Sequence, residues 1–162
     1  MSKQISTSLV ALSLAAICTA ATAQNLPKSG TINIHTGWSA SGDTVTVAEN
    51  HMQGHGTVSG SAFNENGSGP LHLGPANCVY TFFLLDGSIK GKGYCAFGDR
   101  DGDRLFTDYE GTDGAGGPKG INTIIGGTGK YAGIKGSGQY NCEPGGANGE
   151  LACKQNFNYR LP

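Results

Sequence analysis

Cys78 and Cys95 stand at equal distances on either side of the dipeptide Asp86-Gly87, and this symmetry limits the fold more than any other feature of the chain. Asp-Gly between two apolar runs is the strongest short signal for a two-residue β-hairpin turn. In such a hairpin, residues equally far from the turn face each other, so Cys78 meets Cys95. The pair falls at a non-hydrogen-bonded site, where Cα atoms lie ~4.5 Å apart, a separation that suits a disulfide. The sequence therefore predicts a crosslinked hairpin.

The same register sorts the hairpin side chains onto two faces. On the predicted inward face, the two cysteines face each other, and the large residues of the first strand mostly face small residues of the second. The inward pairs are Cys78 with Cys95, Tyr80 with Gly93, Phe82 with Gly91, and Leu84 with Ile89. The other face carries Lys90 and Lys92, so we expect it to meet solvent. Large rings over bare glycine backbone, Tyr80 over Gly93 and Phe82 over Gly91, are typical of a tightly curved sheet.

The assignment of faces persists into the next strand when Asp99–Asp103 is taken as a loop. Three inward pairs then follow: Phe97 with Leu105, Cys95 with Thr107, and Gly93 with Tyr109. On the outward face, Lys92 meets Glu110 as an opposite charge. Agreement across two turns predicts a continuous antiparallel sheet.

A second cysteine pair, Cys142 and Cys153, predicts another hairpin around residues 143–152. Its inward face is mostly apolar or glycine: Ile134, Gly136, Gly138 and Tyr140 opposite Leu161, Tyr159, Phe157 and Gln155. Its outward face is polar, with Lys135 opposite Arg160 as the one like-charge pair. We expect each disulfide to contribute ~2–3 kcal/mol, because each closes a short loop.

Further strands are predicted at Thr31–Trp38, Thr44–Met52 and Gly120–Gly126, with short segments at Gly56–Phe63 and Leu71–Leu73. About eight strands joined by short turns predict an all-β fold, an eight-stranded antiparallel up-and-down β-barrel with two disulfides. Closure into a barrel removes exposed sheet edges. A two-sheet sandwich is the alternative, and pairing of the first strand with the last would distinguish the two.

The run Gly126–Gly133 (GGTGKYAG), followed by Gly136-Ser137-Gly138, resembles a signature of the allene oxide cyclase and dirigent barrel superfamily. Gly93-Tyr94-Cys95 and Asp101-Gly102-Asp103 look like the corresponding strand pair of small exported bacterial members. The resemblance covers Thr31 to Arg160 in layout. It implies an eight-stranded barrel and a homo-oligomer, often a trimer, and plant members act on hydrophobic substrates inside the barrel. It carries no catalytic residue over to this chain.

The N-terminus has the pattern of a signal peptide, which we predict over residues 1–23. Lys3 precedes an apolar stretch, and Ala21-Thr22-Ala23 fits the small-residue cleavage rule. A single barrel domain, residues 24–162, follows. Of the five cysteines, only Cys18 lies in the leader, and an even number of cysteines in an exported chain favours disulfides. The predicted location is periplasmic or secreted.

Composition argues against several partners. The net charge is −1 and there is no basic run, so nucleic acid is a poor partner. No second apolar segment is long enough for a membrane span. The four histidines, His35, His51, His55 and His72, lack zinc-binding spacing, and neither a catalytic serine motif nor a cofactor motif is present. We predict no metal and no cofactor, and catalytic residues stay unassigned.

The segment Asp99–Glu110 offers one alternative to that prediction. Its acidic residues match part of a calcium loop, and Asp99, Asp101 and Asp103 would be the ligands. However, Arg104 occupies the position where glycine permits the sharp turn, and Glu110 already faces Lys92. A structural turn rich in Asp and Gly is therefore the preferred interpretation.

The inward residues allow either a packed core or a ligand pocket, since eight-stranded barrels commonly fill their own interior. The pocket candidates are Tyr80, Phe82, Phe97, Tyr109, Tyr140, Gln155, Phe157 and Tyr159, with Trp38 as a further candidate near the rim. The predicted function is an exported barrel without enzymatic activity that binds a small hydrophobic ligand or mediates protein interaction. Two alternatives remain: a cyclase or isomerase acting on an apolar substrate, and an envelope protein that self-associates through the outer row Val79, Phe83 and Leu85.

Overall fold

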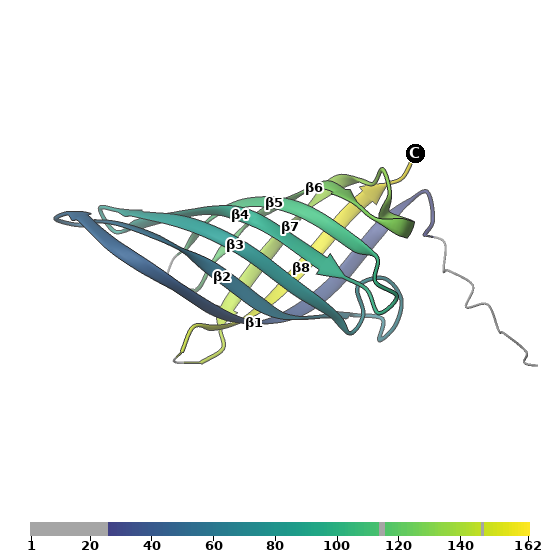
Figure 1. Ribbon diagram of the computed structural model, residues 1–162, viewed down its shortest axis with the longest axis horizontal. Coiled ribbons are helices and arrows are strands. Elements are labelled where there is room, and N and C mark those ends of the chain that lie inside the picture. Colours follow the sequence, from purple (N-terminus) through teal and green to yellow (C-terminus); the bar gives the residue numbers. More distant parts are fainter. Residues whose placement is uncertain (1–25, 114–115, 147) are drawn as a thin grey trace, which may run out of the picture.

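The computed structural model describes residues 26–113, 116–146 and 148–162, which form a closed barrel of eight antiparallel strands (Figure 1). Each strand pairs with its neighbours in the sequence, so the predicted up-and-down barrel is confirmed. The elements are β1 (Ser29–Ala48), β2 (His51–Asn64), β3 (Gly74–Leu85), β4 (Ser88–Gly98), β5 (Arg104–Asp113), β6 (Lys119–Gly127), the 3₁₀ helix η1 (Gly129–Tyr131), β7 (Lys135–Pro144) and β8 (Glu150–Arg160). The predicted signal peptide lies outside the described residues.

Pairing of the first strand with the last closes the barrel. The ladder between β1 and β8 runs from Ser29 opposite Arg160 to Ser39 opposite Glu150. This pairing decides for the barrel over the two-sheet sandwich. Beyond Ser39 the ladder with β8 ends, whereas pairing of β1 with β2 continues to Ala48.

The predicted registers are confirmed in the three hairpins. Cys78 faces Cys95 and Cys142 faces Cys153, and both pairs form disulfides, with Cα–Cα distances of 4.1 and 4.0 Å. Thr107 faces Cys95 across the next turn, as expected. Side chains alternate between the two faces of a strand, so one correct pair places every other residue of that hairpin. The two disulfides fit an oxidising compartment.

The predicted ends of the first strands are wrong. A break was expected between Trp38 and Thr44, yet β1 runs unbroken for 20 residues. Its small residues do not end the strand, because Gly42 packs where a Cβ atom would stand 2.2 Å from the carbonyl oxygen of His55. The expected strand Thr44–Met52 instead contains the β1–β2 turn, where Asn50 has a φ of +57°.

The predicted segment Leu71–Leu73 is also not a strand. It lies in the connection between β2 and β3, and both leucines have positive φ. Leu71 is nevertheless fully buried, so its apolar character reflects core packing rather than sheet pairing.

The barrel interior is divided along its length. At the end that holds the β2–β3, β4–β5 and β6–β7 connections, a group of side chains with no exposed surface packs in the interior: Ile34, Leu71, Phe97, Leu105, Tyr131, Ile134 and Phe157. Phe97 makes edge-to-face contacts with Phe157 at 5.3 Å and with Trp38 at 6.1 Å between ring centroids. We call this the packed end.

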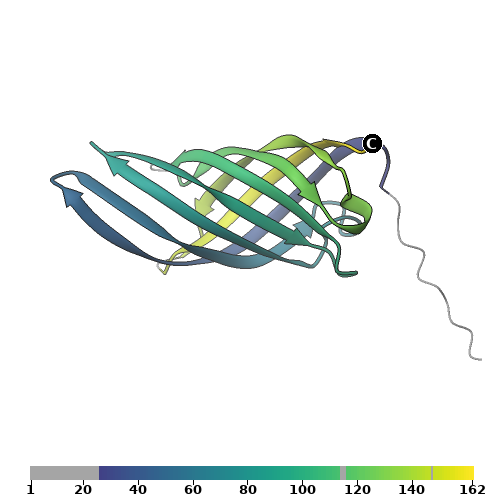
Figure 2. The same cartoon turned by 45° about the horizontal axis from the view of Figure 1, so that its top comes forward.

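The opposite end is where the β1–β2 and β3–β4 hairpins reach furthest (Figures 1 and 2). We call it the hairpin end. Its strands continue past the point where β1 leaves β8, so its walls are incomplete on that side. In the described part of the chain, no helix is long and apolar enough to cross a membrane.

Candidate ligand-binding cavity

A chain of buried polar side chains crosses the middle of the barrel and separates the packed end from the hairpin end. Thr107 donates to Asn122 over 3.2 Å, and the Asn122 amide donates to Gln155 over 3.0 Å. Gln155 in turn donates to the hydroxyl of Thr36 over 2.8 Å. These four residues come from β5, β6, β8 and β1 and are all at least nine-tenths buried. Buried polar groups linked in this way fix one another's orientation.

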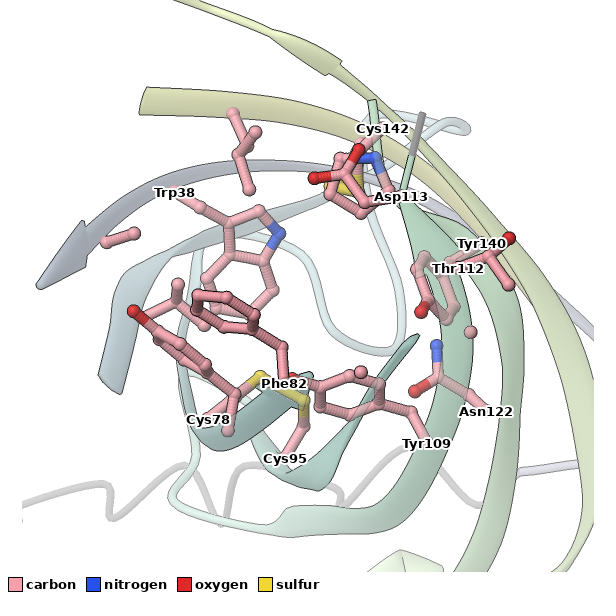
Figure 3. Close-up of a pocket in the computed structure, with 18 of the residues that line it drawn as sticks. Trp38, Cys78, Phe82, Cys95, Tyr109, Thr112, Asp113, Asn122, Tyr140 and Cys142 are labelled. Carbon is pink, nitrogen blue, oxygen red and sulfur yellow. A yellow bond between two sulfur atoms is a disulfide. The ribbon is translucent and has the colours of Figure 1, made fainter. Parts of the chain in front are cut away.

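Above this floor, the hairpin end holds a cavity of about 280 Å³ (Figure 3). Its walls are mainly aromatic, aliphatic and disulfide side chains, with Asn122 and Gln155 at the bottom. The lining comprises Trp38, Ala40, Val58, Cys78, Tyr80, Thr81, Phe82, Ile89, Gly91, Cys95, Tyr109, Gly111, Thr112, Asp113, Pro118, Asn122, Tyr140, Cys142, Leu151, Cys153 and Gln155. Both disulfides thus form part of the cavity wall as well as crosslinking the strands.

Glycines leave the space into which the aromatic rings of the wall extend. A Cβ atom at Gly54 would stand 2.1 Å from the ring of Phe82, and one at Gly56 would stand 2.7 Å from the hydroxyl of Tyr80. The ring of Tyr109 lies over Gly93 in the same way. The aromatic-over-glycine arrangement is therefore present.

Two of the predicted ring positions are wrong, however. Tyr80 and Phe82 face Gly93 and Gly91 in register, but their rings lie over glycines of β2 on the other side. Side chains of a strand lean rather than stand upright over their register partners, and the free space over β2 accepts them. Gly91 is left uncovered, with no atom closer than 3.7 Å to the position of a Cβ.

Burial raises the pKa of two tyrosines in the cavity, Tyr109 and Tyr140. It raises the pKa of Tyr140 to about 12, with a further contribution from the negative charge of Asp113. Burial also raises the pKa of Tyr109, to which the neighbouring tyrosines add. The two rings meet edge to face at 5.8 Å. Both phenols therefore stay neutral near pH 7 and can donate hydrogen bonds to a ligand.

The structure divides the predicted pocket residues between two regions. Tyr80, Phe82, Tyr109, Tyr140 and Gln155 line the cavity. Phe97 and Phe157 instead belong to the packed end, below the polar floor. Tyr159 lies over Gly30 and borders a separate pocket of about 240 Å³, lined also by Leu26, Asn64 and Lys130.

Sequence reasoning missed two polar residues of the cavity, Asp113 and Asn122. Asp113 faces Ile89 in the β4–β5 ladder, two steps beyond the pair Gly91 with Gly111. Continuing the predicted register to the end of the strand would have placed Asp113 inward. Asn122 faces Tyr109 in the β5–β6 ladder, and the β-bulge of that ladder lies further from the β5–β6 connection than this pair. The sequence predicts no register for β6, so it does not place Asn122.

The loop Asp99–Asp103 lies at the packed end and is held by the Gly-Lys-Tyr turn of η1. The ammonium group of Lys130 lies 2.8 Å from Asp99 and 2.6 Å from Asp101. The buried carboxylate of Asp99 also accepts hydrogen bonds from the hydroxyl of Tyr131 and the backbone N–H of Leu71. We call this group the closing cluster. It joins three loops that are far apart in the sequence.

Gly129 is required for this contact. Its φ is +51°, and a Cβ atom there would stand 1.8 Å from the carboxylate of Asp103. That carboxylate accepts a hydrogen bond from the backbone N–H of Lys130 over 3.0 Å. The glycine at position 129 therefore lets the backbone of the Gly126–Gly133 motif lie close to the Asp99–Asp103 loop.

The closing cluster bears on the calcium alternative, because Lys130 and backbone donors occupy carboxylate oxygens that a calcium ion would need. In residues 26–113, 116–146 and 148–162, no three His, Cys, Asp or Glu side chains are grouped so that they could hold a metal ion. His35 and His51 instead lie near single acids, Glu65 and Asp86, at 3.6 and 3.8 Å.

Comparison with solved structures finds barrels of similar fold. The pterocarpan synthase dirigent protein GePTS1 matches with a TM-score of 0.53 at 18% identity, over 83% of this chain and 92% of that chain. The pterocarpan synthase dirigent protein PsPTS1 matches with a TM-score of 0.52 at 16% identity, over 84% of this chain and 98% of that chain. The barrel has the same fold as these two dirigent proteins.

At this level of identity, the likeness to dirigent proteins establishes the fold. The resemblance seen in the sequence is confirmed to that extent, and the bacterial branch stays a prediction. No protein-family profile matches the chain, and no curated protein matches its sequence.

Proposed function

We propose that this barrel is a binding protein that holds one small, mostly apolar, ring-containing molecule in the cavity at its hairpin end. The observation that carries the proposal is the division of the interior. At one end a group of fully buried side chains occupies the interior, whereas the other end keeps a cavity of about 280 Å³ among aromatic side chains. A barrel of this strand number has room to fill itself or to hold one small ligand. In this barrel, packed side chains occupy one half of the interior and the cavity occupies the other half.

The size and chemistry of the cavity limit its occupant. An apolar protein cavity of about 150 Å³ already takes up benzene, so the space here suits a molecule of one or two rings. Asn122, Gln155 and the neutral phenols of Tyr109 and Tyr140 supply the few polar groups that orient a ligand in an otherwise apolar site.

Binding without turnover is the function that this cavity supports best. Tyr109 and Tyr140 are held neutral by their raised pKa values, so they serve as hydrogen-bond donors rather than bases near pH 7. A cyclase or isomerase is the second candidate, because Asp113 gives the cavity a carboxylate that the predicted register did not include.

Self-association is supported by a different surface. Val79, Phe83 and Leu85 on β3 are exposed, and so are Val45 and Val47 on the neighbouring hairpin. Gln53 pairs with both Val45 and Phe83, so the apolar groups lie on one outer face that spans β1 to β3. An apolar face of this kind is typical of a subunit contact.

Export rests on the predicted leader together with the two disulfides. We expect protein taken from its source to begin at Gln24 and to lie in the periplasm or the medium. N-terminal sequencing of the purified protein tests this, and retention of residues 1–23 would contradict it.

Trp38 allows a direct test of binding, because it is the only tryptophan of the chain and lines the cavity. We expect the uncharged two-ring molecule coumarin to change Trp38 fluorescence in a saturable way. Gly91→Leu should abolish the change, since the side chain would enter the cavity where the glycine is uncovered. Lys92→Leu, on the outward face of the same strand, is the matched control.

Equal binding by the wild type and Gly91→Leu, with both folded, would overturn the proposal. Native mass spectrometry of protein from its source provides a second test that needs no variant. A molecule of one or two rings that is recovered bound to the barrel supports the proposal. Protein that is consistently recovered without a ligand, and that also does not bind coumarin, contradicts it.

A further inference from the structure

The formal charge found among the described lining residues of the cavity is negative. Among the described residues that line it, Asp113 is the only one with a formal charge, and none of these residues is Lys, Arg or His. A cavity with one carboxylate and no cation among its lining residues disfavours an anionic ligand. It favours a ligand that brings a positive charge.

Aromatic rings supply a second attraction for such a charge. Trp38, Tyr80, Phe82, Tyr109 and Tyr140 all line the cavity, and Trp38 is the residue type whose ring face attracts cations most strongly. The rings present π faces or edges to one space rather than to separate parts of the surface (Figure 3). Aromatic groups around a cation are the usual protein solution for binding quaternary ammonium groups.

Asp113 stands where a charged group of the ligand could reach it. It ends β5 at the hairpin end, and its carboxylate borders the same open space as Trp38 and Tyr140 (Figure 3). Its negative charge acts on Tyr140, raising the pKa of that phenol in addition to burial. A carboxylate has room for about four hydrogen bonds, so a ligand cation adds to the contact that Asp113 already makes.

We propose that the occupant of the cavity is an organic cation, a ring-bearing alkylammonium or quaternary ammonium compound whose positive group lies between Asp113 and the aromatic wall. Its apolar ring would point down toward the amide floor of Asn122 and Gln155. This inference rests on the proposed binding function and narrows its ligand class.

Two probes of the same shape test the charge. Benzyltrimethylammonium carries the cation, and neopentylbenzene is its uncharged isostere. By calorimetry with the whole mature chain, we expect the cation to bind at least about tenfold more tightly than the isostere. The anion 4-phenylbutyrate should bind more weakly than either. Added salt should narrow the preference, because it screens Asp113.

Two variants test the assigned residue. Asp113→Asn keeps the shape of the side chain and should remove most of the preference for the cation while leaving the isostere within about twofold. Asp108→Asn changes an acid on the outward face of the same strand and should leave both affinities unchanged.

The outcomes separate the two proposals. A wild type that binds the isostere as tightly as the cation overturns the organic-cation ligand while the apolar binding site stands. A preference that survives undiminished in Asp113→Asn overturns the placement of the positive group beside Asp113. Failure of both probes and of coumarin overturns the binding function itself. The comparison of cation with isostere is made on the wild type, so it remains decisive even where Asp113→Asn does not fold.

Discussion

Tyr140 on β7 reaches across Gly120 and lies over Gly111 on β5, where a Cβ atom would stand 2.2 Å from the tyrosine hydroxyl oxygen. Gly111 and Gly120 face each other in register and leave a strip of bare backbone for the ring. The same construction recurs where Tyr80 crosses Gly56 to Gly42. The cavity wall therefore depends on glycine pairs that lie side by side on neighbouring strands.

This arrangement predicts that inward glycines differ sharply in their tolerance of alanine. Gly111→Ala places a Cβ 2.2 Å from the Tyr140 hydroxyl and 2.3 Å from the carbonyl oxygen of Lys119, so backbone and ring must both move. We expect it to lower the free energy of unfolding by about 1–3 kcal/mol. Gly91→Ala, which meets no atom within 3.7 Å, should change stability by less than about 0.5 kcal/mol. Urea denaturation measures both, and equal losses would contradict this account of the wall.

The closing cluster predicts a large cost for removing Lys130. The Lys130 side chain is 10% exposed and the Asp99 side chain 4%, so Lys130→Met leaves a buried carboxylate without its main partner. We expect the free energy of unfolding to fall by about 3–5 kcal/mol. Lys135→Met removes an exposed lysine that faces Arg160 and should stay within about 0.5 kcal/mol of the wild type. A small loss in Lys130→Met would show that the closing cluster does not hold the packed end.

The same variant predicts a definite pH dependence. The hydrogen bond from Lys130 lowers the pKa of Asp101, and burial lowers the pKa of Lys130 but is outweighed by its bonds to Asp101 and Asp99, which raise it. Because its pKa is lowered on folding, Asp101 stabilises the folded state at pH values above its ordinary pKa of 3.8. This stabilisation is lost as the pH falls through the pKa that Asp101 has in the folded state. Because its pKa is raised on folding, Lys130 stabilises the folded state at pH values below its ordinary pKa of 10.5. This stabilisation is lost as the pH rises through the pKa that Lys130 has in the folded state.

The stability gap between the wild type and Lys130→Met should therefore be constant over the neutral range. It should narrow below about pH 4 and at strongly alkaline pH. Urea midpoints across the pH range test this. A gap that changed between about pH 5 and 9 would point to another titrating group.

The sequence predicts the register of this barrel well for a simple geometric reason. Side chains alternate with a period of two, and the cysteines fix which residues face each other. One correct pair, such as Cys78 with Cys95, then determines the side of every residue in its hairpin. Thr107 and Tyr109 were placed inward by counting alone.

Features that depend on distant packing could not be predicted in this way. The length of β1 depends on Gly42 lying under a ring from β3, two strands away. The closing cluster joins Leu71, Asp99 and Lys130, which no local pattern connects. The boundary between packed interior and cavity depends on how inward side chains from different strands pack, as Phe97 does against Phe157, and alternation alone does not decide that.

The outer apolar face predicts self-association that one charge disrupts. Phe83→Lys puts an ammonium group into the centre of this face and should shift an oligomer toward monomer, measured by analytical ultracentrifugation. Ile121→Lys is the matched control, because Ile121 on β6 is 49% exposed, as Phe83 is, but lies elsewhere on the barrel. A monomeric wild type, or equal effects of both variants, would contradict the assignment of this face.

Tyr140 provides a spectroscopic test of the cavity geometry. Its pKa of about 12 lies above the ordinary 10.0 because the ring is buried and Asp113 is nearby. Asp113→Asn should therefore move the ionisation of Tyr140 to lower pH, and Asp108→Asn on the outward face should leave it in place. Alkaline absorbance titration, with Tyr140→Phe as the reference for assignment, measures the shift.

The same raised pKa makes stability fall with pH. Between pH 10 and about 12 the unfolded chain loses the Tyr140 proton while the folded barrel keeps it, so the folded state binds more protons and is destabilised as the pH rises. Tyr140→Phe has no proton to lose at this residue and should show a shallower alkaline decline than the wild type. If Tyr140 ionises at its ordinary pH in the folded wild type, the ring is solvated, and the enclosed aromatic wall that both binding proposals require does not exist.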